Sequence, residues 1–222
     1  MLAKRSHFHS GTNLIFLPLT FSSAGFSHLY YGFSFVLESC IYAAASKNIL
    51  CMKELFSAGK FLKVLQKDLK MNGKMHRFYI IDVKDGVIII PITDRGEIIL
   101  ERHFRPALDD YLYELPAGYI DDGEKPRGAA IRELEEETGY LAKKVRLLFT
   151  VYTSSGRSKQ KAYFFVATKF VGGNMRYDGG ELISKIIKVN LKKAIEMVNR
   201  GKITDLGTMA AILYLQTHKI SM

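Results

Sequence analysis

The sequence predicts an α/β fold in which a mixed β-sheet lies between helices, with an N-terminal β-hairpin region in front of it. Runs of residues typical of strands outnumber helical patterns along the chain. The dipeptide Asn72-Gly73 is a strong signal for a tight turn between two paired strands. A mixed order of strands with few helices is typical of an α/β sandwich.

The expected strands are separated by recognisable turns. Asn72-Gly73 joins the first two strands, and Asp85-Gly86 leads into an apolar run short enough to be a buried strand. Alternation of apolar and polar residues identifies the next two strands. Strands are therefore expected at about 60–70, 74–83, 87–90, 97–104, 111–115, 145–152, 163–170 and 182–189.

Three helices are expected. The first begins near Pro126, because a proline in the first helical turn loses no hydrogen bond. The other two close the chain at 191–200 and about 206–218. Gly201 is suited to end one of them, and Thr204 or Asp205 to cap the start of the next.

Composition bounds the class of protein. The 222 residues are 48% hydrophobic and 24% charged, as in globular proteins rather than disordered ones. The two cysteines, Cys40 and Cys51, form no disulfide framework or zinc spacing, so a cytoplasmic location is expected. The net charge of +10 comes from dispersed lysines without a basic-aromatic motif. Dispersed lysines usually indicate a solvated surface, and the charge alone does not distinguish nucleic acid, a membrane surface or an anionic small-molecule substrate. The lack of a basic-aromatic motif argues against nucleic acid.

The first fifty residues differ from the rest. Residues 10–37 contain no Lys, Arg, Asp or Glu. Three interpretations stay open: a membrane or targeting segment, a misplaced start codon with the true start at Met52, or an ordinary extension. Pro18, Gly25 and several serines argue against a membrane span. We accordingly divide the chain into an extension at 1–51 and a main domain at 52–222.

The most informative stretch is GYIDDGEKPRGAAIRELEEETGY, at residues 118–140. On a helix, Glu133, Glu136 and Glu137 share one face, because each residue turns about 100°. Glu135 points elsewhere and is expected to be solvated. Like charges at this spacing repel, and carboxylate oxygens suit hard cations such as Mg²⁺, Mn²⁺ or Ca²⁺.

This spacing resembles the Nudix box, G-x5-E-x7-R-E-U-x-E-E-x-G-U, in which U is a bulky apolar residue. All the fixed positions match, and Tyr140 at the last U is a mild departure. The flanks resemble the ADP-ribose pyrophosphatase branch through ERHFRP at 101–106, ELPAG at 114–118 and GKITD at 201–205. The resemblance implies a Nudix-type α/β/α sandwich.

The resemblance also implies roles for individual residues. Mg²⁺, with Mn²⁺ as the alternative, would be held by the following metal-site residues: the carbonyl of Ala117, Glu124, Glu133, Glu136 and Glu137. Arg132 would orient the carboxylates, and Glu124 would fix Arg132 or bind metal through water. Glu133, Glu137 and Arg132 are thus the catalytic candidates in the box. Arg105 and Glu114 are the substrate-binding candidates.

The chain departs from this branch in one loop. ADP-ribose pyrophosphatases carry Ser-Pro-Gly after the box and a glutamate general base a few positions later. Here residues 154–161 read SSGRSKQK, so that Gln160 or Lys161 stands where the glutamate is expected. An amide cannot take up a proton at neutral pH. The base is therefore expected elsewhere, at Glu181 or Asp178, or within the box itself.

The predicted reaction is metal-dependent hydrolysis of the diphosphate linkage of a nucleoside diphosphate sugar, with ADP-ribose giving AMP and ribose 5-phosphate. Another nucleotide sugar or a dinucleotide is the nearest alternative substrate. A Nudix-like sensor that binds ADP-ribose without cleaving it is the alternative from another class. The resemblance also implies a homodimer formed through the strands at about 60–83.

Overall fold

The computed structural model describes residues 49–173 and 182–218. Most of the predicted extension at 1–51 lies outside these residues, so the division at residue 51 stays a prediction. The described strands are β1 (Ile49–Ser57), β2 (Leu62–Met71), β3 (Lys74–Val83), β4 (Gly86–Pro91), β5 (Glu97–Arg105), β6 (Asp110–Glu114), β7 (Ala117–Tyr119), β8 (Tyr140–Tyr152), β9 (Lys161–Gly172) and β10 (Ile183–Asn190). The described helices are α2 (Pro126–Thr138), α3 (Leu191–Asn199) and α4 (Leu206–Thr217).

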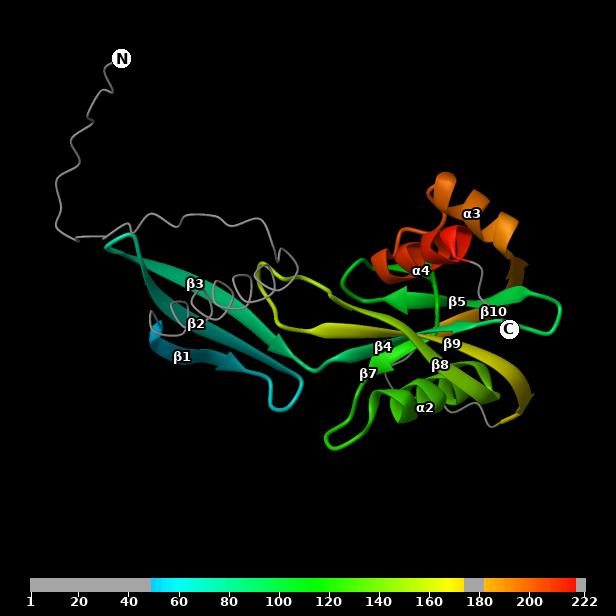
Figure 1. Cartoon of the computed structure of the whole chain (residues 1–222), viewed down its shortest axis with the longest axis horizontal. Coiled ribbons are helices and arrows are strands. Elements are labelled where there is room, and N and C mark those ends of the chain that lie inside the picture. The colour runs from blue at the N-terminus through cyan, green and yellow to red at the C-terminus, as the bar shows by residue number, and fades with distance from the viewer. Residues whose placement is uncertain (1–48, 174–181, 219–222) are drawn as a thin grey trace, which may run out of the picture. The chain divides into compact units, whose positions relative to one another are not determined.

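Two sheets form the body of the fold. One has the strand order β7-β4-β9-β8, and the other has the order β10-β5-β6. Strands β4 and β9 are parallel, whereas the remaining pairs in these sheets are antiparallel. Figure 1 shows α2 on one side of the strands and α3 with α4 on the other. The predicted α/β/α sandwich with mixed strand directions is therefore confirmed.

Each helix side has its own apolar core. Ala130 and Leu134 of α2 pack with Val87 and Ile89 of β4. The residues of β4 that alternate with these, such as Ile90, pack toward α3 and α4. A strand buried on both faces must be apolar throughout, which explains the continuous run that begins at Val87.

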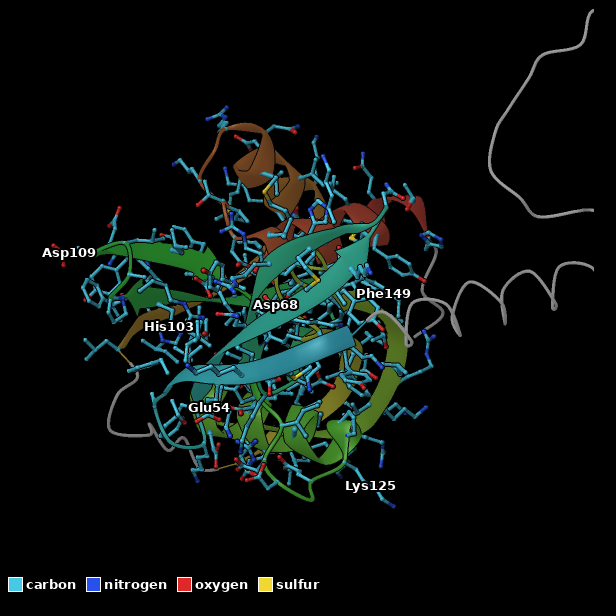
Figure 2. The ribbon with its side chains drawn as sticks, turned by 90° about the vertical axis from the view of Figure 1, so that its left-hand side faces the viewer. Glu54, Asp68, His103, Asp109, Lys125 and Phe149 are labelled. Carbon is cyan, nitrogen blue, oxygen red and sulfur yellow. The ribbon has the colours of Figure 1, made fainter. Side chains whose placement is uncertain are left out.

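The third sheet, β1-β2-β3, contains the predicted hairpin. Asn72 and Gly73 have φ angles of 51° and 77°, as a two-residue type I′ turn requires. Glu54 and Asp68, labelled in Figure 2, each pair with a cation of the same sheet, at 2.9 and 3.0 Å. The sequence did not identify β1, whose pairing with β2 lies across the turn after residue 57.

The helix ends agree with the sequence. Pro126 is the first residue of α2, and Gly139 ends the helix with a φ of 70°. The side chain of Asp205 accepts a hydrogen bond from the N–H of Thr208 and caps α4. Gly201 follows α3 with a φ of 66°. Within residues 49–173 and 182–218, no helix is long and apolar enough to cross a membrane.

Candidate active site

Arg132 of α2 gathers the carboxylates of the box. Its Nη1 donates to Glu133 Oε1 at 2.8 Å and to Glu136 Oε2 at 3.0 Å. Its Nε and Nη2 donate to Glu124 at 3.2 and 3.0 Å, and Nη2 also donates to the carbonyl oxygen of Tyr119. A planar guanidinium with five N–H groups can serve several acceptors at fixed angles. Arg132 therefore fixes the relative positions of these three glutamates.

Both carboxylate oxygens of Glu124 are hydrogen-bonded within the protein. Besides Arg132, Glu124 accepts from the N–H of Asp121 at 3.1 Å, which closes the turn before α2. The hydrogen bonds from Arg132 hold the pKa of Glu124 below its usual value. Of the two roles expected for Glu124, the contacts seen here favour fixing Arg132; binding metal through water stays a prediction.

Two glutamates of α2, Glu133 and Glu137, contact β7. The N–H of Ala117 donates to Glu137 Oε2 at 2.9 Å. The carboxylate of Glu133 lies against Gly118 so closely that a Cβ there would be 2.2 Å from Glu133 Cδ. Position 118 must therefore lack a side chain if Glu133 is to keep this position. The backbone at Ala117 is thereby brought beside the buried carboxylates of Glu133 and Glu137.

The donor set suits a hard divalent cation. The box brings the carboxylates of Glu124, Glu133 and Glu136 onto one guanidinium, and Glu137 adds a fourth carboxylate beside β7, so negative charge is in excess. Oxygen donors with an excess of negative charge are typical of Mg²⁺ and Mn²⁺ sites. The residues that would hold such an ion are those that lie together where α2 meets β7: Ala117, Glu133, Glu136 and Glu137.

Glu135 differs from its expected state. The sequence predicted a solvated side chain, but Glu135 is half-buried, and a Cβ at Gly173 would lie 2.9 Å from its Cγ. The end of β9 packs against this part of α2, which a helical pattern alone does not reveal. Glu135 still lies away from the face shared by Glu133, Glu136 and Glu137.

A second set of polar residues lies on β5. Glu101, His103 and Arg105 alternate along the strand and so point to one face. Glu101 is fully buried and His103, labelled in Figure 2, is 4% exposed. His103 Nδ1 lies 3.0 Å from Glu101 Oε1. Burial raises the pKa of Glu101 above its usual value, while the bond to His103 acts in the opposite direction.

Arg105 is held by a buried carboxylate on the neighbouring strand. Its Nε donates to Glu114 Oε1 at 3.0 Å, and its Nη2 makes a second hydrogen bond to the same carboxylate. This pairing raises the pKa of Arg105 further. Both substrate-binding candidates therefore lie in one fork-to-fork pair, with the Arg105 side chain 37% exposed.

A cleft of about 440 Å³ lies between these two sets of residues. We call its α2 side the helix wall, formed by Arg132, Glu133 and Glu136, and its β5 side the strand wall, formed by His103 and Arg105. Lys60 and Lys84 add positive charge, and Phe61, Phe104 and Tyr119 add aromatic surface. The volume is within the usual range for small-molecule sites. The cleft thus combines carboxylates with cations that can bind an anion.

The loop in which the sequence departs from the resemblance is tied to the body of the fold. Gln160 Nε2 donates to the carbonyl oxygen of Lys84 at 2.7 Å, and Gln160 Oε1 accepts from Thr153 at 2.8 Å. The N–H of Lys161 donates to Asp85 at 2.8 Å. Both ends of the Gln160 amide are thus used to hold the loop in place.

The predicted bases after this loop, Asp178 and Glu181, lie outside the described residues, and their roles stay predictions. Lys84 and His103 are among the cleft residues that the sequence did not identify. Lys84 bridges Asp121 and Asp122 at 3.1 and 3.3 Å, and His103 lies within the ERHFRP motif. One signal in the sequence could have identified His103. It is a polar residue in a predicted strand, at a position where the alternation of apolar and polar residues predicts a buried side chain.

Comparisons with known proteins agree with this geometry. Residues 83–201 match the family model described as the NUDIX domain, which is more than half of the chain. An ADP-ribose pyrophosphatase of Bacillus subtilis (strain 168) is 34% identical over 167 residues, covering 74% of this chain and 90% of the relative. A GDP-mannose pyrophosphatase of Salmonella typhimurium is 29% identical over 186 residues, covering 78% and 97%.

A solved structure supports the fold. The crystal structure of an ADP compounds hydrolase is similar with a TM-score of 0.67 and 22% sequence identity, covering 76% of this chain and 91% of that one. At this identity the similarity concerns the fold alone. The sequence matches reach further, because they include the box and its flanks. The chain therefore belongs to the Nudix family, as a pyrophosphatase that resembles the ADP-ribose pyrophosphatase branch.

Proposed function

We propose that this enzyme hydrolyses the diphosphate linkage of a nucleoside diphosphate sugar with the help of Mg²⁺, and that ADP-ribose is its preferred substrate. The products would be AMP and ribose 5-phosphate. The observation that carries the proposal is the cleft that joins the carboxylates of the helix wall to the cations Lys60, Lys84 and Arg105. The similarity to a bacterial ADP-ribose pyrophosphatase supports this choice of substrate.

The charges in the cleft suit this reaction. When bound, Mg²⁺ neutralises phosphate oxygens and lowers the pKa of water. Glu133, Glu136, Glu137 and the carbonyl of Ala117 would hold the ion, and Arg132 keeps the first two carboxylates in register. Arg105, Lys60 and Lys84 would bind the remaining diphosphate charge. Glu114 would act on substrate through Arg105, because it holds the guanidinium by two hydrogen bonds.

The proton acceptor for the attacking water is proposed among the carboxylates rather than in the loop at 154–161. Gln160 is engaged at both ends and has no basic group. Glu133 and Glu137 in the box, and Glu181 beyond β9, are the candidates. Replacing Glu181 by Gln separates them: a loss of kcat with unchanged KM supports Glu181 as base, and unchanged kcat leaves the box carboxylates.

The central test is hydrolysis of ADP-ribose by the purified full chain with Mg²⁺. Glu133→Gln and Glu137→Gln should each reduce kcat by at least about 100-fold, by analogy with loss of an acid–base group. Glu135→Gln is the matched control, because Glu135 lies on the same helix but on another face, and should retain activity. Chelation with EDTA should abolish turnover, and added Mg²⁺ should restore it. Equal activity in all three variants would contradict the proposal.

Two alternatives are decided by the same assay. A panel with GDP-mannose and a dinucleotide beside ADP-ribose ranks the substrates by kcat/KM; the similarity to a GDP-mannose pyrophosphatase motivates the first of these. The non-catalytic sensor predicts tight ADP-ribose binding by calorimetry without turnover of any diphosphate. That outcome would contradict the proposed hydrolase activity and support a role as a non-catalytic sensor.

We also propose that the chain forms a homodimer through the β1-β2-β3 sheet. Large apolar side chains are exposed there, among them Phe56, Met75 and Tyr79, each more than half exposed. Exposed apolar side chains that gather on one sheet make it a candidate interface. Tyr79→Glu should shift the sedimentation coefficient to that of a monomer, whereas Leu213→Glu, an exposed apolar position on α4, should not. A monomeric wild type would contradict the proposal.

A further inference from the structure

Three ligand-type side chains meet behind the strand wall. One oxygen or nitrogen atom from each of Glu101, His103 and Glu137 lies within 4.8 Å of the other two. Two of these residues come from β5 and the third from α2. All three are buried, with exposed fractions of 0%, 4% and 0%. Buried groups of this kind in native proteins are normally paired or bind a metal.

The bonding of Glu101 is incomplete. Oε1 lies 3.0 Å from His103, but Oε2 has no hydrogen-bond partner in the described part of the chain although it is fully buried. An unsatisfied buried carboxylate oxygen costs free energy, so it requires a physical explanation. A cation between Glu101, His103 and Glu137 would supply the missing partner.

The local charge also favours a divalent cation. Glu101, Glu114 and Glu137 interact electrostatically with a single guanidinium, that of Arg105. When all three carboxylates are ionised, they leave an excess of two negative charges. Arg105 itself is committed to the Glu114 carboxylate through its Nε and Nη2.

We propose that Glu101, His103 and Glu137 form a binding site for a transition-metal ion of the Zn²⁺ type, which differs from the all-oxygen site of the box by its histidine ligand. Imidazole nitrogen is a favoured ligand of Zn²⁺ and a poor one for Mg²⁺. Zn²⁺ holds its ligands at about 2.0–2.2 Å, so two ligand atoms of a tetrahedral site lie about 3.3–3.6 Å apart. The three ligand atoms, which lie within 4.8 Å of one another, would reach this spacing by side-chain rotations that draw them toward the ion.

The site also has an entry path and an open position. His103 lines the cleft, so an ion can reach the site from there. Three protein ligands leave a fourth tetrahedral position for water or another small ligand. The bound ion would join β5 to α2 directly. The inference does not depend on the identity of the nucleotide substrate, although the site shares Glu137 with the proposed Mg²⁺ site.

The test is calorimetric titration of the metal-free full chain with Zn²⁺ in excess Mg²⁺, without nucleotide. Wild type should show a saturable binding component that Glu101→Gln and His103→Gln each weaken by more than about tenfold, as expected for loss of one ligand. His76→Gln, an exposed histidine on β3, is the matched control and should bind as wild type does. Any Zn²⁺ binding that remains in the double variant Glu101→Gln/His103→Gln comes from other sites, and its contribution is subtracted from that of wild type.

A second readout covers variants that fold poorly. Zn²⁺ should raise the Tm of wild type and of His76→Gln, because a ligand that binds the native state stabilises it, and should raise the Tm of Glu101→Gln much less. Binding that is unchanged by His103→Gln would place the ion at the box carboxylates and overturn the site. The absence of any component that distinguishes wild type from Glu101→Gln would overturn it as well. Failure to hydrolyse ADP-ribose would contradict the proposed function alone.

Discussion

The carboxylates on the two sides of the cleft are stabilised in different ways. On the helix wall, Arg132 reaches three glutamates, and its own side chain is 30% exposed. On the strand side, Glu101 is fully buried and its described hydrogen bond is to His103. The pKa of Glu124 is lowered by Arg132, whereas burial raises the pKa of Glu101. A carboxylate near a cation and a carboxylate in an apolar interior therefore respond to pH in opposite directions.

The difference also bears on function. Carboxylates that are held by a partly exposed guanidinium can exchange that partner for a hydrated cation at small cost. A buried carboxylate has no water to return to, so a missing partner is costly. The helix wall is thus suited to an ion that comes and goes with substrate, and the strand side to an ion that stays bound.

The largest effect is expected for Gly118→Ala. The added Cβ would displace the Glu133 carboxylate from β7. Because a displacement of about 1 Å at a catalytic group can cost 100-fold in rate, kcat for ADP-ribose should fall by about 100-fold. Stability should change little, since a flexible side chain can move aside. Gly156→Ala, with nothing within 4 Å of its Cβ, is the control. Full activity of Gly118→Ala would show that Glu133 does not need this position.

An intermediate effect is expected for the contribution of Glu101 to stability, which should depend on pH. Because its folded pKa is raised, its contribution to stability is present below the unfolded pKa of about 4.5 and is lost as pH rises through the folded pKa. In EDTA, the stability of wild type relative to Glu101→Gln should therefore fall with rising pH, by at most about 1.4 kcal/mol per pH unit. Urea unfolding at several pH values measures this. A relative stability that rises with pH would mean that Glu101 is better paired than its contacts indicate.

The smallest effect is expected for Glu124 and has the opposite sign. Its folded pKa is lowered, so its contribution is present above the unfolded pKa and is lost as pH falls through the folded pKa. Glu124→Gln should lower the free energy of unfolding by on the order of 1 kcal/mol at neutral pH and by less in acid. Glu196→Gln, which breaks exposed ion pairs on α3, is the control and should have no measurable effect. Equal losses of unfolding free energy in both variants would show that the glutamate cluster at Arg132 stabilises the protein no more than the exposed ion pairs of Glu196.

Much of the fold could be predicted because the signals are local. The turn at Asn72-Gly73, Pro126 at the start of α2 and the cap at Asp205 each depend on a few neighbouring residues. Other features had no local signal. β7 has three residues and exists through pairing with β4. β8 begins at Tyr140 rather than 145, because β9 extends to pair with it.

The sequence by itself determined the family and the acidic face of α2, since one helical turn brings Glu133, Glu136 and Glu137 to the same face whatever surrounds them. Which residues of β5 face α2 was decided by the tertiary structure alone. The alternation of β5 puts Glu101 and His103 on one face, but their burial and their approach to Glu137 depend on how the strand packs against α2. A helix repeats its geometry along the chain, whereas a contact between strand and helix depends on residues more than thirty positions apart.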